Sequence, residues 1–525
     1  MAIKIVLSVP NFKINYLYMK KLILSLLLLI GVVLSLNAQQ RQSQTLTEEQ
    51  QYLSAMHEYI TSEKLYGYVK EFSDSVYLGR LVGTEAMAKA VEKFKNYLVE
   101  FGLEPGGDRG GFIQEYPNPS VEIGYGSGMS IFIPVSTNNK KEVVYVEKTY
   151  PWADGWFAGN YSGNGEIKAE VVYVGFGVSA PELGYDDYAG IDVRGKIVLI
   201  EGETPNRSRE PEDIAKWYKH TLHQTKMENA AKNGAIGMLY KWVPGPNSLY
   251  NPNFLYCHVT DQVVEDIFLG TGKTYKETAD KIYATLKPAS FNTGKMARIK
   301  MVSKYNPNAT GKNVLGIIRG SDPKLADEYI ILSAHLDHLG MIPYHIAGSN
   351  DNVSCTAAML GAAEALAKAG IKPKRSIIFF SVDGEEAGLT GSHYFAENPT
   401  VPKEKIKAIL NLEQLGIGDR FSASYAHNFP GLPKHIEKAA NTYTLRRVSV
   451  SPTTYLPRPR TDGAVFMKAG YPCIDLRAAG GSGAYHHPLD NPDFINPETL
   501  QASANWLYWL LILMANDENF DPAKM

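Results

Sequence analysis

The stretch SIIFFSVDGEEAGL, residues 376–389, sets a largely apolar run directly against a turn that carries two adjacent acids. Similar apolar runs occupy residues 329–333 and 408–412, and a helical pattern at 354–369 ends at Gly370. Continuous apolar strands that alternate with helices indicate a mostly parallel sheet sandwiched by helices. We therefore predict an α/β fold with a parallel-centred sheet.

Side chains that can bind metals gather where these runs end. His335 lies just beyond the first run, and Glu385 and Glu386 lie beyond the second. In parallel α/β folds, ligands bind outside the carboxyl ends of the strands. Two histidines with several carboxylates can supply the terminal ligands, the bridging carboxylate and the free base of a two-metal hydrolytic site. In chain order the candidate ligands are His335, Asp351, Glu386, Glu413 and His486.

Two aspartates have local contexts that suit such a site. Asp337 stands two residues after His335 at a strand end, so both side chains point to one side. It can then accept the second ring N–H of His335, although surface His–Asp pairs are common. Asp351 lies in the tight loop 348–352 ahead of a helix and can present one oxygen to each of two metals. An Asx turn or helix-capping loop is the alternative for Asp351.

The adjacent acids Glu385 and Glu386 follow an apolar strand, where burial of a carboxylate is costly unless it is paired. We interpret Glu386 as a ligand and Glu385 as a general base. A base works best outside the metal's inner sphere, where it can still take a proton from the attacking water.

The last candidate segment surrounds His486. Tyr485 can donate its hydroxyl to the oxyanion of a tetrahedral intermediate, and Asp490 is a candidate supporting acid. His487 competes with His486 as the ligand on residue type alone. The loop TDG at 461–463 precedes an apolar helix and suits either a substrate pocket or a helix cap.

The N-terminal part of the mature chain, residues 45–158, begins with helical patterns. Residues 46–72 are amphipathic, and residues 87–101 carry apolar side chains at alternating spacings of four and three. Thr84 is a plausible N-cap for this second helix, and Gly102 is a terminating glycine.

Residues 159–295 form a segment of different texture, dominated by short β-runs. Within it, YDDYAG at 185–190 and GKIVL at 195–199 resemble the protease-associated domain, a small β-rich module. The scattered histidines and acids of this segment carry no metal pattern, so we expect a non-catalytic lid or substrate-gating surface. The catalytic remainder is residues 296–525.

The complete set of motifs resembles the co-catalytic zinc aminopeptidase and glutamate carboxypeptidase family of metallopeptidases. That family's pattern is HxD, an NDN-type loop, GEExGLxGS, a strand ending in an acid, and YHxxxD. The matching segments are HLD at 335–337, NDN at 350–352, GEEAGLTGS at 384–392, NLE at 411–413 and YHHPLD at 485–490. GRLVGT at 79–84 and FGLEP at 101–105 are similar to the family's N-terminal part.

The resemblance implies two Zn²⁺ ions per chain. One would be held by His335 and Glu413, the other by Glu386 and His486, and Asp351 would bridge them. Ions about 3.5–4 Å apart would share a hydroxide.

The resemblance also assigns the remaining roles at the site. Glu385 would deprotonate the attacking water and later protonate the leaving amine. The motif selects His486 over His487. Glu413 departs from the family, which usually has Asp there, and its extra methylene can alter the second metal's affinity or the substrate pocket.

The expected function is a zinc exopeptidase acting on peptides, with aminopeptidase ahead of carboxypeptidase or dipeptidase. A glutaminyl cyclase, an acyltransferase that needs one zinc, is the alternative from another class. A catalytically dead relative is disfavoured by the intact ligand set and by Glu385.

Composition and the N-terminus suggest the compartment. Met19-Lys20-Lys21 is a basic start, residues 22–36 are apolar, and cleavage is expected near Ala38, so residues 1–38 are read as an extension and signal peptide. The run is shorter than a spanning helix, although an uncleaved anchor is the alternative. We expect a periplasmic or secreted enzyme without a stable membrane anchor.

The composition excludes two further classes of function. The net charge of −2, without a basic stripe, argues against nucleic acid as a partner. Three scattered cysteines argue against a disulfide framework.

Overall fold

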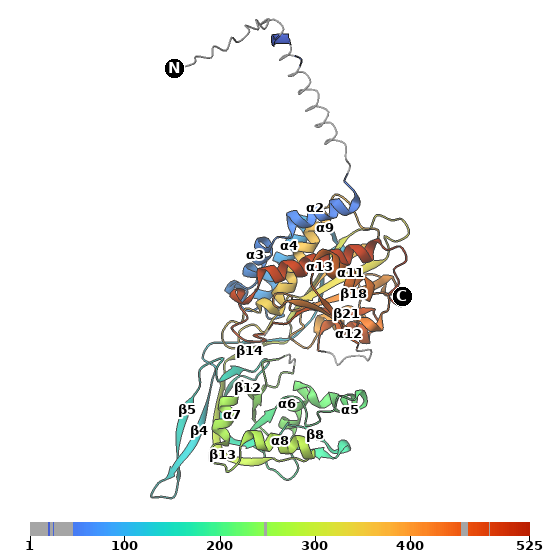
Figure 1. Ribbon diagram of the computed structural model, residues 1–525. Coiled ribbons are helices and arrows are strands. Elements are labelled where there is room, and N and C mark those ends of the chain that lie inside the picture. The colour runs from blue at the N-terminus through green and yellow to red at the C-terminus, as the bar shows by residue number, and fades with distance from the viewer. Residues whose placement is uncertain are drawn as a thin grey trace, which may run out of the picture. The chain divides into compact units, whose positions relative to one another are not determined.

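The protein is described by a computed structural model that covers residues 19–21, 25, 46–245, 249–452, 460–481 and 483–524 (Figure 1). The chain divides into two compact units, residues 1–53 and residues 54–525. Nearly all of the expected signal segment, including the cleavage site near Ala38, lies outside the described residues. Within the described ranges, no helix is both long enough and apolar enough to cross a membrane.

The larger unit contains the predicted parallel-centred sheet. Its central strands run in the order β17, β16, β18 and β21, each parallel to the next. They are β16 (Tyr329–His335), β17 (Ser376–Val382), β18 (Ile406–Glu413) and β21 (Cys473–Ala479). The flanking strands are β1 (Glu104–Pro105), β2 (Ile113–Pro117), β15 (Thr310–Ile318), β19 (Arg420–Ser424) and β20 (Val448–Val450). β15 and β19 join this centre antiparallel, so the predicted α/β architecture is confirmed.

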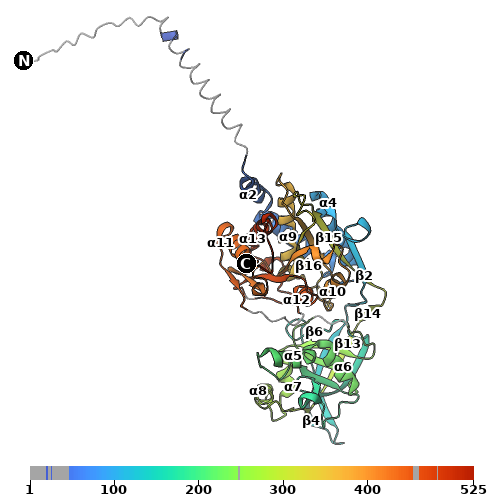
Figure 2. The ribbon, with the colours of Figure 1, turned by 90° about the vertical axis from the view of Figure 1, so that its right-hand side faces the viewer.

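Helices cover both faces of this sheet (Figure 2). α9 and α13 pack against β16 and β17 and carry further helices on their outer side, whereas α10 and α12 cover the other face. On that second face Phe380 of β17 contacts Phe395 of α10 and Phe466 of α12, with ring centroids 4.7 and 6.2 Å apart. The helices are α2 (Glu48–Tyr59), α3 (Ser62–Phe72), α4 (Glu85–Phe101), α9 (Ser354–Lys368), α10 (Thr390–Glu397), α11 (Pro433–Tyr443), α12 (Asp462–Lys468) and α13 (Pro497–Asn516).

Helix boundaries follow the signals in the sequence. Thr84 caps α4 by accepting the N–H of Met87, and Gly102 ends the helix in the left-handed region at φ 84°. Thr461 caps α12 in the same way by accepting the N–H of Ala464, so the capping interpretation of the 461–463 loop holds.

A second sheet has its own core and four helices. Strands β7, β10, β11 and β12 form a parallel centre, and β13 pairs with both β7 and β4. Its strands are β4 (Gly128–Thr137), β5 (Val143–Thr149), β6 (Trp156–Ala158), β7 (Gly165–Tyr173), β10 (Ile197–Glu201), β11 (Gly237–Lys241), β12 (Leu255–Val259) and β13 (Phe291–Met301). Its helices are α5 (Pro211–Thr221), α6 (His223–Lys232), α7 (Asp261–Phe268) and α8 (Tyr275–Thr285). Because the β4–β5 hairpin pairs onto β13, the sheet extends beyond the predicted range 159–295.

The chain passes between the two sheets twice, and the two crossings pair with each other. Strand β3 (Ser120–Ile123) leads toward the second sheet and β14 (Ser303–Asn306) leads back, and the two form an antiparallel ladder. A second small ladder joins β8 (Ser179–Ala180) to β9 (Tyr185–Asp186).

Arg80 is a fully buried cation behind the edge of the first sheet. Its guanidinium donates to the carbonyls of Phe72, Leu336 and Ala347 at 2.7 Å and of Gly348 at 3.1 Å. Burial lowers its pKa to about 10, which still leaves it charged at neutral pH. Arg80 therefore joins the end of β16, the loop before α9 and the end of α3 through one side chain.

Replacement of Arg80 by Leu would leave these carbonyls without their donor and remove a cation from among buried acids. We expect Arg80→Leu to lower the free energy of unfolding by about 3 kcal/mol or more, seen as an earlier midpoint in urea. Arg194→Leu is the matched control, because Arg194 is 80% exposed and forms an ion pair with nearby Asp192. Equal midpoints for both variants would contradict the structural role of Arg80.

Candidate metal centre

The five predicted ligands meet at the carboxyl edge of the first sheet. His335 and Glu413 are the last residues of β16 and β18, and Glu386 follows β17. Asp351 lies in the turn before α9, and His486 lies in the loop after β21. All five are buried, with exposed fractions of 5% or less. Parallel neighbouring strands place their ends together, which explains why residues far apart in the sequence converge here.

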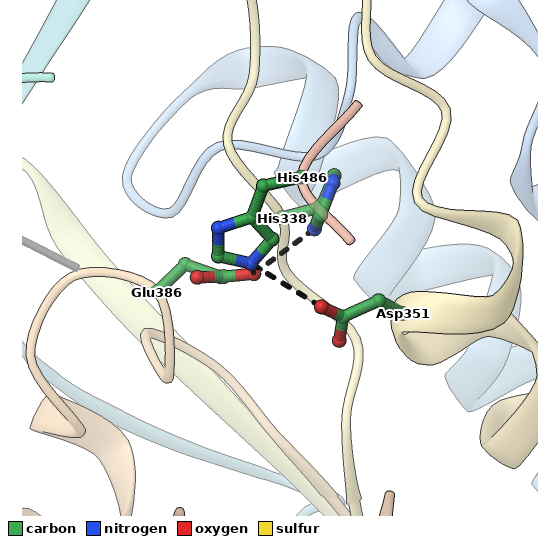
Figure 3. Close-up of side chains that lie close together, drawn as sticks. All are labelled: His338, Asp351, Glu386 and His486. Atoms are coloured by element: carbon green, nitrogen blue, oxygen red, sulfur yellow. Dashed lines mark hydrogen bonds and ion pairs between the residues drawn. The ribbon is translucent and has the colours of Figure 1, made fainter. Parts of the chain in front are cut away.

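The ligand-type atoms form two groups that share Asp351. Within each group, these atoms lie within 4.8 Å of one another. One group contains His335, Asp351 and Glu413. The other group is His338, Asp351, Glu386 and His486 (Figure 3).

Asp351 turns one carboxylate oxygen toward each group. Its Oδ1 lies 3.3 Å from Nε2 of His335, and its Oδ2 lies 3.2 Å from Nε2 of His486. A carboxylate that faces two imidazoles with separate oxygens has the orientation that a bridge between two metals requires.

Three buried atoms of the second group lack a hydrogen-bond partner in the described part of the chain. They are Nε2 of His338, Nε2 of His486 and Oε2 of Glu386. Polar atoms buried without a partner are destabilising, and a cation bound by His486 and Glu386 would give such atoms a partner. Imidazole nitrogen and carboxylate oxygen are donors that zinc accepts, so the residues present are consistent with zinc binding.

Charge compensation within the site is strong. Burial opposes charge on Glu386, but His486 and His338 outweigh it and lower the pKa of Glu386 to about 2. Burial also opposes charge on His486, yet Glu386 and Asp351 raise its pKa to about 10. The carboxylates of the site thus stabilise a positive charge that lies between them.

Glu413 is held by a neighbour on its own strand. Asn411 donates its side-chain N–H to Oε1 of Glu413 at 3.1 Å. Burial raises the pKa of Glu413 to about 8, with His335 opposing the shift. A cation beside Glu413 would favour its ionised form, as a metal ligand requires.

Asp337 supports the site, but through a different contact from the predicted one. Its carboxylate accepts the backbone N–H of Glu385 and of Glu386, both at 3.1 Å. The ring nitrogen Nδ1 of His335 lies 3.1 Å from the backbone carbonyl of Asp337 and 3.8 Å from its carboxylate. The Asp337 carbonyl therefore orients the imidazole, while its carboxylate orients the two glutamates.

Asp490 supports the loop that carries Asp351. Its two oxygens accept the backbone N–H groups of Asn350 at 2.7 Å and Asp351 at 3.0 Å. Burial raises the pKa of Asp490 to about 7. The predicted supporting acid therefore acts on the backbone of the shared aspartate.

His486 is oriented by the second sheet's domain. Its Nδ1 donates to the backbone carbonyl of Pro244, which leaves Nε2 to face Asp351 and Glu386. His487 takes no part in either group: it is partly exposed, and its Nδ1 accepts the N–H of Leu489 at 3.2 Å.

Tyr485 stacks on the ring of His486, with centroids 3.6 Å apart and planes 20° apart, and it is 46% exposed. It also lines a cavity of about 600 Å³ with the neighbouring Leu389 and with Leu222 and Trp242 of the second domain. The walls of this cavity are largely apolar, and its charged side chains include Arg460 and Lys468. The cavity therefore offers space for a side chain next to the metal-binding edge.

Glu385 lies beside both groups without being part of either. It is 6% exposed, and burial raises the pKa of Glu385 well above its usual range, with His335 opposing and Glu386 and Glu413 adding to the shift. No hydrogen bond holds its carboxylate among the residues that the structure describes. Its carboxylate is thus not fixed by a hydrogen bond in the described part of the chain.

Sequence reasoning missed His338, Asn411 and Pro244. His338 directly follows the predicted HLD motif, so a second imidazole three residues after His335 was a usable signal. Asn411 precedes Glu413 by two residues on one strand and therefore shares its face. The carbonyl of Pro244 belongs to another domain, and no local pattern predicts its contact.

Two segments of the chain match known protein families. Residues 313–510 match Peptidase family M28, and residues 167–258 match the PA domain. A glutamate carboxypeptidase 2 homolog from Caenorhabditis elegans is 26% identical over 408 residues, which are 64% of this chain and 49% of that protein. The chain spans about half or less of the length of the curated relatives it matches.

Solved structures share the fold across most of the chain. An aminopeptidase from Aneurinibacillus sp. strain AM-1 superposes with a TM-score of 0.61 at 19% identity, covering 90% of this chain and 98% of that one. A zinc aminopeptidase from Bacillus subtilis gives a TM-score of 0.56 at 16% identity, covering 89% and 98%. Residues 313–510 are thus similar to Peptidase family M28 and residues 167–258 to the PA domain, and the chain shares its fold with the two aminopeptidase structures.

The two adjacent histidines provide a direct test of the ligand assignment. We expect His486→Ala to lose more zinc affinity than the 10- to 100-fold typical for loss of an outer hydrogen bond to a ligand, because an inner donor is removed. His487→Ala should keep wild-type zinc content, measured by atomic emission after dialysis against a chelator buffer. Zinc loss in the His487 variant instead would move the ligand by one residue.

Proposed function

We propose that the protein is a zinc-dependent exopeptidase with two zinc ions per chain, most simply an aminopeptidase. One ion would be held by His335 and Glu413, the other by Glu386 and His486, with Asp351 bound to both. The observation that carries this proposal is the pair of ligand groups sharing Asp351 at the sheet edge.

When bound, the two ions would supply the Lewis acidity that activates water and polarises the scissile carbonyl. Glu385 would accept the proton of the attacking water and return it to the leaving amine. Its buried position beside both ligand groups and its unbonded carboxylate support this role. Tyr485, stacked on His486 at the cavity wall, would donate its hydroxyl to the oxyanion.

The cavity beside Tyr485 could receive part of a peptide substrate. Its wall is largely apolar, which suits an apolar substrate side chain, and the PA domain forms part of that wall. The choice of the amino end is supported by the two structural neighbours that are described as aminopeptidases.

A carboxypeptidase or dipeptidase is the second candidate. Arg460 and Lys468 line the same cavity and could hold a substrate carboxylate. A curated relative described as a glutamate carboxypeptidase 2 homolog points the same way. A single-zinc glutaminyl cyclase is disfavoured by the second ligand group around His335 and Glu413.

The leader expected at residues 19–38 would direct the enzyme to the periplasm or out of the cell, where peptides are its substrate. Cys257, Cys355 and Cys473 are buried, free cysteines.

Glu385→Gln tests the general base. The amide cannot take a proton, so we expect kcat to fall by about 10²- to 10⁴-fold while zinc content stays at the wild-type level. Glu404→Gln, at an exposed surface position, is the control and should match wild type. Near-normal kcat in the Glu385 variant would remove this residue from the base role.

A substrate panel tests the class and the recognised end. We expect the mature zinc-loaded protein to release arylamine from aminoacyl-anilides and to leave N-acetylated peptides intact, with activity lost in chelator and restored by zinc. Release of C-terminal residues from N-acetylated peptides would replace aminopeptidase by carboxypeptidase. Cyclisation of N-terminal glutamine without hydrolysis would reject the peptidase proposal.

A further inference from the structure

His338 lies in the ligand group of Glu386 and His486 but has no role in the chemistry described above. Its ring is fully buried, and its Nδ1 lies 3.0 Å from Oε1 of Glu386 (Figure 3). A carboxylate oxygen that carries no proton can only accept, so the proton of this hydrogen bond belongs to Nδ1 of His338. The imidazole thus donates to one oxygen of a predicted metal ligand.

The backbone around His338 gives this donor a fixed position. The N–H of His338 donates to the carbonyl of Arg80 at 3.1 Å. On its other side the ring lies against Gly348: a Cβ there would come within 2.5 Å of Cδ2 of His338 and 2.4 Å of the carbonyl of Asp351. Gly348 has φ of 58° and no side chain, which leaves room for the imidazole beside the Asp351 loop.

Glu386 is consequently held at two points by consecutive residues of one turn. Asp337 accepts its backbone N–H at 3.1 Å, and His338 binds its Oε1. The same Oε1 lies 2.8 Å from Nε2 of His486, and Oε2 is buried without a hydrogen-bond partner in the described residues. His338 therefore holds the carboxylate at the oxygen that faces His486.

We propose that His338 is a positioning residue of the metal centre, which donates Nδ1–H to Glu386 and so orients this carboxylate toward the metal shared with His486. The inference rests on the proposed zinc function. Glu413 has a corresponding donor in Asn411, so each terminal carboxylate is oriented by one side-chain N–H. Hydrogen bonds of this kind to a metal ligand typically contribute 10- to 100-fold in metal affinity.

The chemistry of the donor atom defines a set of variants. The amide nitrogen of Asn stands two bonds from Cβ, as Nδ1 of His does, whereas the amide nitrogen of Gln stands three bonds away. We expect His338→Ala to weaken zinc binding about 10- to 100-fold in chelator competition. His338→Asn should recover most of that loss, and His338→Gln should not. His345→Ala is the matched control, because His345 lies in the same loop region outside both ligand groups.

The outcomes separate this inference from the proposed function. Wild-type zinc affinity in His338→Ala, or equal weakness in the Ala and Asn variants, overturns the positioning role. A changed visible spectrum of the Co²⁺-loaded Asn variant overturns it as well, because an unchanged set of ligands should keep the band positions. Failure of the wild-type protein to bind zinc would instead reject the proposed function. Unfolding of the metal-free variants in urea is measured in parallel, and a midpoint like wild type assigns the affinity loss to the site.

Discussion

The Asp351 carboxylate is the contact on which the rest of the site depends. It is the one residue common to both ligand groups, and it faces His335 and His486 with different oxygens. A buried carboxylate between two imidazoles is stable only where its charge is matched, because removal from water is costly. The surrounding fold must therefore keep Asp351 in place while leaving the space between the donors to cations.

Three buried charged side chains hold Asp351 and its neighbours in place without entering the space between the predicted ligands. Asp490 accepts the backbone N–H groups of the Asp351 loop, Asp337 accepts those of the two glutamates, and Arg80 binds the carbonyls on either side. Each acts on backbone rather than on a ligand side chain. The two aspartates accept hydrogen bonds from backbone N–H groups, whereas Arg80 donates hydrogen bonds to backbone carbonyls. The negative charges of the aspartates and the positive charge of Arg80 also compensate one another. Buried side chains of opposite charge thus hold the backbone at the carboxyl edge of an otherwise apolar sheet.

The sequence predicts the ligands at the strand ends, but it does not predict the buried contacts that hold them in place. His335, Glu386 and Glu413 are predictable because each ends or follows an apolar strand, and parallel strands bring such ends together. The sheet and its helices follow from the same pattern, and the caps Thr84 and Gly102 lie where local rules place them. Arg80 could be seen only as part of a motif, since its carbonyl partners are set by three separate segments.

The contact between Pro244 and His486 depends even more on the tertiary structure, and it changes the role expected for the PA domain. A metal-binding imidazole needs its second nitrogen bonded so that the first stays unprotonated and correctly aimed. For His335 that partner is the carbonyl of Asp337, two residues away, whereas for His486 it is a carbonyl on another domain. The same segment places Trp242 and Val243 in the cavity wall beside Tyr485. A molecule that fills this cavity would touch the loop that orients His486. The PA domain therefore helps to position a predicted metal ligand and also forms part of the cavity wall.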